Sequence, residues 1–352
     1  MTLIVACLDG LDPGYLDAID TPEWEAIANE GTSGTCDGLV PSLTNVNNVG
    51  IVTSTFPETN GITGNTYYDH ESDEKVQMKS SDYLRCETLL ERASAAGKDV
   101  AMLTAKEKLE QFIGRGVEYA ASAESPPEEL EEAVGSAPDI YSGDASAWLL
   151  DAAVHVAETC NPDLLYVSTT DVVPHKHGPD KQQATEWVQA LDTGLGALHE
   201  YGPLVATADH GMTDKTKRID LKAVLTSEGI ESEVVQLIRD RHTYHHQNLG
   251  GAAYVYTDET ASALDRIEGV EAVLSTAEAA ERYRLPTDRI GDYLVLGSPE
   301  TVFGPIEGDK LIDSVELRSH GSHHEQRVPY VASTGERMEY NIDSFDAVGL
   351  DV

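Results

Sequence analysis

Two stretches decide the fold of this chain, LIVACLDG at residues 3–10 and LVATADHG at residues 204–211. Each is an apolar run, typical of a strand buried in a parallel sheet, that ends in acidic residues or histidine. A third apolar run, residues 163–167, precedes Asp171 and His175. Ligands bind at the carboxyl ends of strands in open α/β sheets. The pattern therefore predicts that these polar residues meet in one metal site of a metallohydrolase.

The rest of the chain alternates between strand-like and helix-like patterns. Strands are expected over residues 3–8, 100–103, 164–167, 204–208 and 328–332, and helices over residues 22–30, 82–96, 145–158 and 182–199. Residues 123–135 are rich in Glu, Pro and Ser and are expected to form a solvated excursion. The alternation predicts an α/β fold with a doubly wound, mostly parallel sheet.

This alternation weakens between about residues 220 and 315. Short strands are expected there over residues 233–237, 251–257, 271–274 and 292–296, with a helix over residues 259–266. We therefore assign residues 1–214 and 318–352 to a catalytic α/β core built from both ends of the chain. Residues 215–317 are assigned to an inserted α+β cap.

The composition is strongly acidic. The 352 residues include 24 Lys and Arg against 62 Asp and Glu, which gives a formal net charge of −38. Nucleic-acid binding is disfavoured because phosphate contacts need basic patches. Intrinsic disorder would be an alternative, but 40% hydrophobic residues in periodic runs indicate a folded chain. Adaptation to high salt, as in a halophilic protein, explains the charge better because salt screens the self-repulsion.

Targeting signals are not evident. The N-terminal apolar run has no cationic segment before it and meets Asp9 early, so it is interpreted as a strand and not as a signal peptide. No apolar stretch approaches the ~20 residues needed to span a bilayer. The four cysteines are far apart, which indicates neither a zinc knuckle nor a disulfide framework. We expect a cytoplasmic protein without a membrane partner.

Two sets of ligands follow from the strand ends. Asp171 and His175 have a spacing that suits one ion, and His320 could supply its third ligand, whereas Asp9, Asp209 and His210 would hold a second ion. Each motif alone is more often a helix cap or a solvated loop, but together they are more specific. Zinc takes such oxygen and nitrogen ligands, although manganese is also possible.

Two adjacent cations serve phosphoryl transfer, which calls for a hydroxyl nucleophile. The best candidate is Thr44, in the segment SLTNVNNVGIVT at residues 42–53. This pattern predicts a polar turn that runs into a helix, whose N-terminal amides and dipole favour a phosphoryl group. The alternative is that Thr44 is only an N-cap. Beside the metal residues, the nucleophile is favoured.

These residues, in this order, resemble the alkaline phosphatase superfamily, specifically its branch of nucleotide pyrophosphatases/phosphodiesterases and phosphonoacetate hydrolases. The resemblance implies a threonine nucleophile and two zinc ions, one on Asp171, His175 and His320, the other on Asp9, Thr44, Asp209 and His210. His323 and His324 compete with His320, which we prefer because the branch usually shows His-Gly at this point.

One segment narrows the choice within the branch. TAKEKL at residues 104–109 resembles the T-A-K-x-K-L stretch of phosphonoacetate hydrolases, as do TNVNN at 44–48 and GNTYYD at 64–69. Thr104 and Glu107 have capping-box spacing, which places Lys106 and Lys108 in a first helical turn, where the dipole disfavours cations. Lysine is scarce in this chain, so the pair suggests a bound anion. The alternative is two solvated lysines.

The substrate that this resemblance implies is phosphonoacetate, cleaved to acetate and phosphate through a phosphothreonine on Thr44. Breaking a carbon–phosphorus bond expels a carbanion, which the adjacent carboxylate must delocalise, and Lys106 and Lys108 would stabilise that charge. Asn65 could bind a phosphonate oxygen. The family also uses an arginine from the cap, for which Arg241 is the nearest match and Arg239 the competitor. His245 and His246 are interpreted as cap structure.

Two other functions stay open at this point. A phosphodiesterase or nucleotide pyrophosphatase would use the same metals and an aromatic slot for a base, for which Tyr67 and Tyr68 are candidates. A non-catalytic acidic protein that binds cations loosely is the third reading, which the ordered set of ligands disfavours. The expected partner is a small phosphonate or phosphate ester. The oligomeric state is open, with a homodimer as one option.

Overall fold

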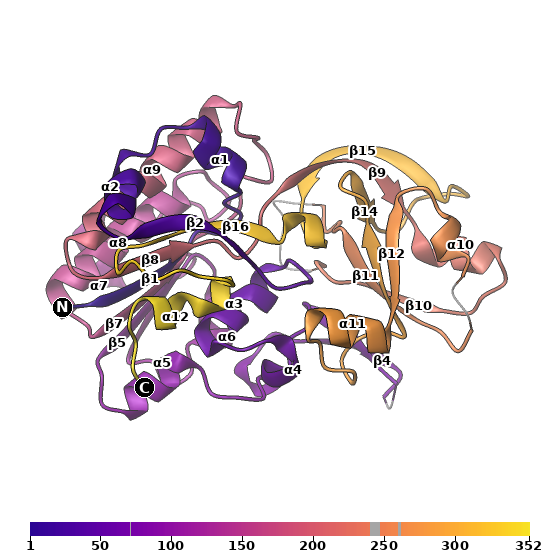
Figure 1. The fold of residues 1–352 in the computed structure, drawn as a ribbon, viewed down its shortest axis with the longest axis horizontal. Helices are drawn as coiled ribbons and strands as arrows, with labels where there is room; N and C mark the ends of the chain where they lie inside the picture. The colour runs from indigo at the N-terminus through magenta and orange to yellow at the C-terminus, as the bar shows by residue number, and fades with distance from the viewer. Residues whose placement is uncertain (71, 240–246, 260–261) are drawn as a thin grey trace.

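A seven-stranded sheet forms the centre of the larger part of the molecule in the computed structural model, which describes residues 1–70, 72–239, 247–259 and 262–352 (Figure 1). The strand order is β2-β16-β8-β1-β7-β5-β6. Their bounds are β1 (Leu3–Cys7), β2 (Thr32–Asp37), β5 (Val100–Thr104), β6 (Tyr119–Ser122), β7 (Leu164–Ser168), β8 (Leu204–Thr207) and β16 (Arg327–Ala332). The five strands from β8 to β6 run parallel, and β16 is antiparallel to both of its neighbours. The mostly parallel α/β fold is thereby confirmed.

Strands β1, β7 and β8 lie side by side because their sequences are apolar on both faces. Ile4 pairs with Leu165 on one side and with Leu204 on the other, and all three side chains are buried. A strand with both faces covered needs such continuous apolar runs. The parallel register brings the carboxyl ends of the three strands to the same edge of the sheet.

Helices cover both faces of this sheet (Figure 1). On one face lie α1 (Pro13–Ala18), α2 (Pro22–Glu30), α8 (Ala145–Cys160) and α9 (Gln182–His199). On the other lie α3 (Thr44–Thr53), α5 (Leu89–Ala95), α6 (Glu107–Ile113) and α12 (Ser344–Ala347). The bounds expected for α2 and α9 are confirmed. None of the helices in the described residues is long and apolar enough to cross a bilayer.

Two expectations for the core are wrong. The helix expected over residues 82–96 begins only at Leu89, because Thr88 and Glu91 form a capping box there, and a 3₁₀ turn covers Ser81–Tyr83. The expected excursion at residues 123–135 contains helix α7 (Glu128–Val134), whose Leu130 is buried. The acidic residues that suggested a solvated loop lie largely on the outer side of that helix, so composition alone concealed it.

The strands between residues 213 and 319 form two further sheets, on the right in Figure 1. The order in one is β10-β11-β13-β12, and in the other β14-β9-β15. The elements are β9 (Thr213–Ile219), α10 (Leu221–Ser227), β10 (Glu233–Gln236), β11 (Ala252–Tyr256), β12 (Val270–Ser275), α11 (Thr276–Tyr283), β13 (Tyr293–Gly297), β14 (Thr301–Phe303) and β15 (Ile312–Ser319). We call this region the cap. Of the helix expected over residues 259–266, the described residues contain a 3₁₀ turn at Leu264–Arg266.

A hairpin from the N-terminal half joins the cap. Strands β3 (Thr66–Asp69) and β4 (Glu74–Gln77) pair with each other, and α4 (Pro57–Asn60) precedes them. The Lys75 ammonium donates to the Val234 carbonyl at 3.0 Å, which fastens the hairpin to β10. The chain between α3 and α5 therefore takes part in both halves of the molecule.

A buried ion pair fixes the segment in which the chain passes from the cap back to the core. Lys215 on β9 donates from Nζ to Glu325 Oε1 at 2.8 Å, and neither side chain has exposed surface. Burial opposes ionisation of Glu325, but Lys215, Thr213 and Ser322 together lower the pKa of its carboxyl below the ordinary value. The pair ties β9 to η3 (His323–Glu325), the 3₁₀ turn just after His320.

Replacing Lys215 with methionine is expected to lower the free energy of unfolding by about 3–5 kcal/mol, because it leaves the Glu325 carboxylate buried without its cation. Urea titration in molar KCl measures this loss. The double variant Lys215→Met, Glu325→Gln should recover part of it, since no buried charge then remains. A single variant as stable as the parent would contradict the account.

Candidate metal centre

Six polar residues predicted from the strand ends and from the His-Gly motif are buried together. Asp9 follows β1, Asp171 and His175 follow β7, Asp209 and His210 follow β8, and His320 follows β15. Their exposed fractions lie between 0% and 7%. Charged and imidazole groups are rarely buried unless they are paired or bind a metal. Their shared burial makes this edge of the sheet the candidate functional site.

The first cluster joins Asp9, Asp209 and His210. His210 Nε2 lies 3.4 Å from Asp9 Oδ1 and 3.6 Å from Asp209 Oδ2. The other carboxylate oxygen of Asp209 accepts from the backbone amides of Gly10, at 3.1 Å, and His210, at 2.9 Å. Gly10 has φ +77°, and a Cβ there would lie 3.0 Å from Asp171 Cβ, so the close approach of the strand ends requires glycine.

The second cluster joins Asp171, His175 and His320. Asp171 Oδ2 lies 2.9 Å from His175 Nε2 and 3.8 Å from His320 Nε2. The rings of His210 and His320 stack with centroids 3.5 Å apart, so the two clusters adjoin. The competing ligands His323 and His324 contact Glu271 in the cap instead. The geometry thus places His320, and neither competitor, at the site.

The histidines are oriented as metal ligands are. Each Nδ1 is hydrogen-bonded to a backbone carbonyl: His175 to Arg318 at 2.9 Å, His210 to Gly211 at 3.0 Å and His320 to Ser42 at 2.7 Å. Such bonds fix the tautomer and leave Nε2 to face a metal. In all three residues Nε2 is the atom that lies near the carboxylates. This arrangement fits divalent cations.

The charges of the site also fit divalent cations. Burial, together with the charges of Asp171 and Asp209, raises the pKa of Asp9 well above its ordinary value, and its Oδ1 has no hydrogen-bond partner among the described residues. Burial lowers the pKa of His210 to about 4 and also lowers that of His320, so both imidazoles are neutral, as ligation requires. Cations among these groups would relieve the repulsion between the carboxylates.

Thr44 lies beside the first cluster, at the beginning of α3. Its Oγ1 is 3.3 Å from His210 Nε2. The N-cap of α3 is Leu43 and makes no side-chain cap bond, so the interpretation of Thr44 as an N-cap is wrong. The hydroxyl instead faces the metal ligands at a helix N-terminus, where the amides and the dipole favour an anionic phosphoryl group.

Asparagines that follow Thr44 hold the helix in place, and the sequence reasoning assigned them no role. Asn48 donates from Nδ2 to the Thr44 carbonyl at 3.0 Å and to Asp209 Oδ2 at 3.4 Å, and its Oδ1 accepts from Tyr166 and Ser168. Asn45 donates to Asn65 Oδ1 at 2.7 Å. Three asparagines within four positions of an apolar helix were the available signal, because a buried amide needs partners.

Lys106 and Lys108 line a cavity of about 60 Å³ in front of the clusters, together with Thr44 and Asn65. Lys106 Nζ lies 3.7 Å from Asp171 Oδ1, and 24% of the side chain is exposed. Burial disfavours the ammonium, but Asp171 and Asp9 outweigh it and raise the pKa of Lys106 above the ordinary value. Lys106 is therefore a cation at the edge of the proposed metal site.

The capping box expected here is absent. Thr104 is the last residue of β5, its hydroxyl donates to the Lys106 carbonyl, and Lys106 itself is the N-cap of α6. The amide of Glu107 donates to Glu124 instead of to a capping hydroxyl. The prediction failed because β5 extends one residue further than expected. Lys108 still falls in the first turn of α6.

The remaining candidates lie in different places. Asn65 lines the cavity, where its amide group is held by Asn45 and by the Ile238 carbonyl. Arg241, His245 and His246 lie outside the described residues, and Arg239 lines a different cavity. Tyr67 and Tyr68 are on β3, where Tyr68 contacts Tyr256 with ring centroids 5.2 Å apart. Neither tyrosine lines the metal-site cavity.

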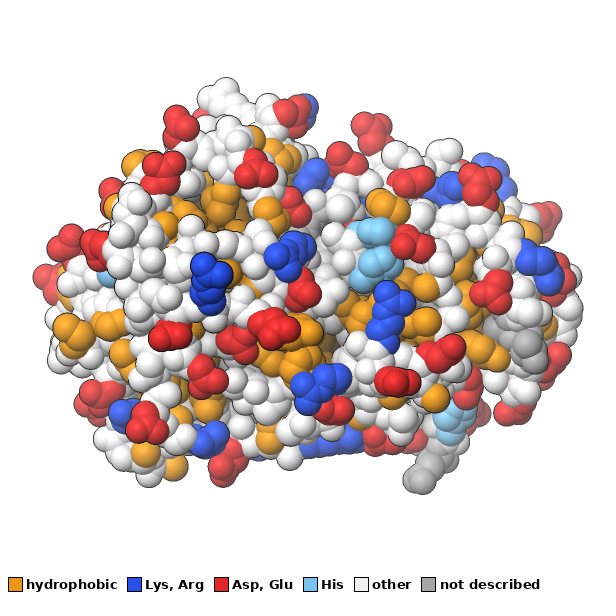
Figure 2. All heavy atoms as spheres, in the orientation of Figure 1, with side chains coloured by type: hydrophobic (Ala, Val, Ile, Leu, Met, Phe, Trp, Pro, Cys, Tyr) orange, Lys and Arg blue, Asp and Glu red, His pale blue; other side chains and the backbone are white. Residues whose placement is uncertain are grey.

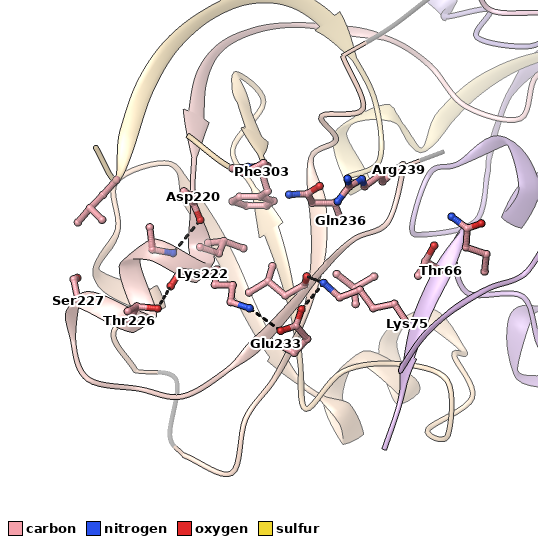
Figure 3. Close-up of a pocket in the computed structure, with 18 of the residues that line it drawn as sticks. Thr66, Lys75, Asp220, Lys222, Thr226, Ser227, Glu233, Gln236, Arg239 and Phe303 are labelled. Atoms are coloured by element: carbon pink, nitrogen blue, oxygen red, sulfur yellow. Dashed lines mark hydrogen bonds and ion pairs between the residues drawn. The ribbon is translucent and has the colours of Figure 1, made fainter. Parts of the chain in front are cut away.

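The cavity that Arg239 lines has a volume of about 950 Å³ and lies in the cap between the hairpin, β10 and α10 (Figure 3). In it, Glu233 lies between Lys75 and Lys222 and pairs with both. Asp220 caps α10 by accepting from the Ala223 amide at 2.9 Å. The described residues that line this cavity include no histidine or cysteine. Lys75, Lys222, Glu233 and Asp220 are thus engaged in structural contacts, and the metal-type ligands lie at the smaller cavity.

Comparison with known proteins agrees with this site. The family model described as type I phosphodiesterase / nucleotide pyrophosphatase matches residues 3–325. Among curated proteins, the venom phosphodiesterase of Naja atra is 27% identical over 231 residues, which make up 60% of this chain and 26% of that protein. The chain thus spans about a quarter of the length of such relatives.

Solved structures resemble the whole chain. Phosphonoacetate hydrolase from Sinorhizobium meliloti 1021, in complex with phosphonoacetate, is 32% identical with a TM-score of 0.91, covering 99% of this chain and 95% of that one. Murine ectonucleotide pyrophosphatase / phosphodiesterase 5, in complex with AMP, has a TM-score of 0.71 at 17% identity and shares the fold, covering 100% and 96%. The chain therefore belongs to the type I phosphodiesterase / nucleotide pyrophosphatase family of the alkaline phosphatase superfamily and is an enzyme of that family.

Proposed function

We propose that this enzyme hydrolyses phosphonoacetate to acetate and phosphate with two zinc ions. The observation that carries the proposal is the position of Lys106. This partly buried cation lines the small cavity together with Thr44 and the metal-type ligands. A phosphate monoester or diester places no carboxylate at this point, whereas phosphonoacetate does. The 32% identity to a phosphonoacetate hydrolase supports the same substrate class.

Each group of residues has its own role in the proposed reaction. Asp9, Asp209 and His210 would hold one ion near Thr44, and Asp171, His175 and His320 the other. When bound, the ions supply Lewis-acid stabilisation of the phosphonate oxygens and lower the pKa of the Thr44 hydroxyl. Thr44 lies at the N-terminus of α3, so the backbone dipole adds positive potential where the phosphoryl group would lie.

The reaction has two displacements. The Thr44 hydroxyl loses its proton as its Oγ attacks phosphorus, the carbon–phosphorus bond breaks, and the electron pair of that bond moves onto carbon and into the carboxylate as an enolate. Lys106 and Lys108 stabilise that developing charge, and protonation of the carbon releases acetate. Water then attacks the phosphothreonine, which releases phosphate and restores the Thr44 hydroxyl.

The size of the cavity argues against a nucleotide substrate. About 60 Å³ suits a small ligand, whereas pockets that bind drug-sized ligands have volumes of roughly 300–1,000 Å³. The two tyrosines considered for a base-binding slot do not line it. Cleavage of phosphate diesters is the alternative activity, since the family model includes phosphodiesterases.

The acidic charge of the surface supports a proposal about the salt concentration in which the enzyme works. On the face shown in Figure 2, acidic side chains are spread over both parts of the molecule. With a net charge of −38, the folded chain repels itself, and molar salt reduces that repulsion. We propose a halophilic, cytoplasmic enzyme, and assays should therefore be made in molar KCl.

The test compares two substrates. Protein stripped by a chelator and reloaded with ZnCl₂ is incubated in molar KCl with phosphonoacetate and, separately, with bis-p-nitrophenyl phosphate. We expect equimolar acetate and phosphate from phosphonoacetate, no product before reloading, and recovery with Zn²⁺; a parallel reloading with Mn²⁺ ranks the metals. Cleavage of the diester without phosphate release from phosphonoacetate would establish the alternative.

A further inference from the structure

A second group of metal-type ligands lies outside the catalytic site. His323 and His324 are the first two residues of η3, and Glu271 is on β12 in the four-stranded sheet of the cap. Among the described residues, the ligand atoms of these three side chains lie within 4.8 Å of one another. The side chains of His323 and His324 are 22% and 24% exposed. Histidine is exposed on the face shown in Figure 2, near the junction of the two parts of the molecule.

The carboxylate of Glu271 lies between the two imidazoles. Its Oε1 is 3.2 Å from His323 Nε2, and its Oε2 is 2.6 Å from His324 Nε2. Zinc binds imidazole nitrogen at about 2.0–2.1 Å and carboxylate oxygen at about 2.0–2.2 Å, so tetrahedral ligands lie about 3.3 Å apart. The separation of Oε1 from His323 Nε2 is close to that value, whereas Oε2 and His324 Nε2 are closer together and would move apart by under about 1 Å to admit an ion. Two imidazoles and one carboxylate form a recurrent set of protein ligands for zinc.

An ordinary ion pair accounts less well for this group. The single Glu271 carboxylate is balanced by one imidazolium, and a second imidazolium with its ring centroid 4.1 Å from the first would be repelled by it, so an ion pair explains the position of only one of the two rings. Metal binding instead takes both imidazoles in their neutral form beside the carboxylate.

The two histidines are held in position by buried contacts of the same turn. Ser322 Oγ accepts from the His324 amide at 3.2 Å, and Glu325 Oε2 accepts from the Ser322 amide at 3.0 Å. Glu325 is itself the partner of Lys215 in the buried ion pair. The ligands on η3 are therefore preorganised by the fold, which lowers the cost of binding.

We propose that Glu271, His323 and His324 form a third metal site, which binds a zinc-class divalent cation and fastens β12 to η3. The site is structural, since it is separate from the residues of the reaction. His323 Nδ1 is buried and has no hydrogen-bond partner among the described residues, unlike Nδ1 of the catalytic histidines. Second-shell partners raise metal affinity about 10–100-fold, so this site binds more weakly than the catalytic pair.

The test counts bound zinc in His324→Ala and Glu271→Gln. Full-length protein is dialysed against ZnCl₂ in molar KCl with excess Mg²⁺, which occupies the surface carboxylates, and the zinc per chain is measured. We expect one zinc fewer per chain in both variants. The rise in melting temperature that zinc binding at the weaker site causes in the parent should also be lost in both. The matched control is His199→Ala, because His199 forms a single imidazole–carboxylate pair with Glu30, 2.9 Å from Nε2 to Oε2, and should leave the count unchanged.

Three outcomes separate this site from the proposed function. His324→Ala should retain the activity of the parent, whereas Asp209→Asn should lose activity and catalytic zinc while it keeps the weaker site. If phosphonoacetate is not a substrate, the difference in zinc count still decides the third site. Equal zinc counts and equal melting shifts in His324→Ala, Glu271→Gln and the parent would overturn the proposal, and unchanged melting temperatures without metal verify that the variants fold.

Discussion

Replacing Thr44 with alanine is expected to lower kcat for phosphonoacetate by at least about 10³-fold, because the variant has no hydroxyl to attack phosphorus. In the structure this hydroxyl lies 3.3 Å from His210 Nε2, next to the Asp9 and Asp209 carboxylates. The remaining ligands are untouched, so zinc binding should be largely retained. The measurement is steady-state release of phosphate together with the zinc count.

A conservative variant provides the control. Thr44→Ser keeps an attacking oxygen at the same position of α3 and should retain activity within about 10–100-fold of the parent. Trapping of a phosphorylated chain by acid quench should succeed with the parent and fail with Thr44→Ala. If Thr44→Ala hydrolysed phosphonoacetate at a rate near that of the parent, water would be the nucleophile and the phosphothreonine route would be wrong.

Replacing Lys106 with methionine is expected to affect the two substrates unequally. For phosphonoacetate, kcat should fall by about 10²–10³-fold, the usual cost of removing one group that stabilises charge in the transition state. For bis-p-nitrophenyl phosphate the fall should be less than about 10-fold, because the aryl oxide leaves without an adjacent carboxylate. Parallel assays of both substrates in molar KCl measure the ratio.

Two variants test whether this effect is specific. Lys310→Met removes a lysine whose side chain is 68% exposed in the cap and should change neither rate. Lys108→Met, which removes the second lysine of the cavity, should also lower kcat more for phosphonoacetate than for the diester, but by a smaller factor than Lys106→Met. Equal losses for both substrates in Lys106→Met would assign Lys106 to phosphoryl binding instead of to the leaving group.

The core strands that precede the candidate ligands were predictable because a strand that is buried on both faces is apolar throughout its sequence. Residues 3–8, 164–167 and 204–208 are apolar on both faces, and the structure places β1, β7 and β8 there. The edge strand β2, TSGTCD, was missed because it is polar and pairs only with β16. Strands β9 and β15 were missed for a similar reason, since TDKTKRI is almost entirely polar and charged and IDSVELRS contains no continuous apolar run.

The candidate site was predictable to the extent that its residues follow strand ends. The choice among His320, His323 and His324 depended on a family resemblance, because three histidines within five positions look alike without coordinates. The structure separates them by direction, with His320 toward Ser42 and the others toward Glu271. The roles of Asn45 and Asn48 depend on contacts with distant residues, which no local pattern records.

The order in which the ligands occur along the chain has a consequence for biosynthesis. Asp9 leaves the ribosome before the cap is made, but His320 follows only after the entire cap has been made. In a nascent chain that ends within the cap, the three carboxylates Asp9, Asp171 and Asp209 are already present while one imidazole is missing. The complete set of candidate metal ligands therefore forms late in translation or after release, and a nascent chain that ends within the cap lacks the last of them.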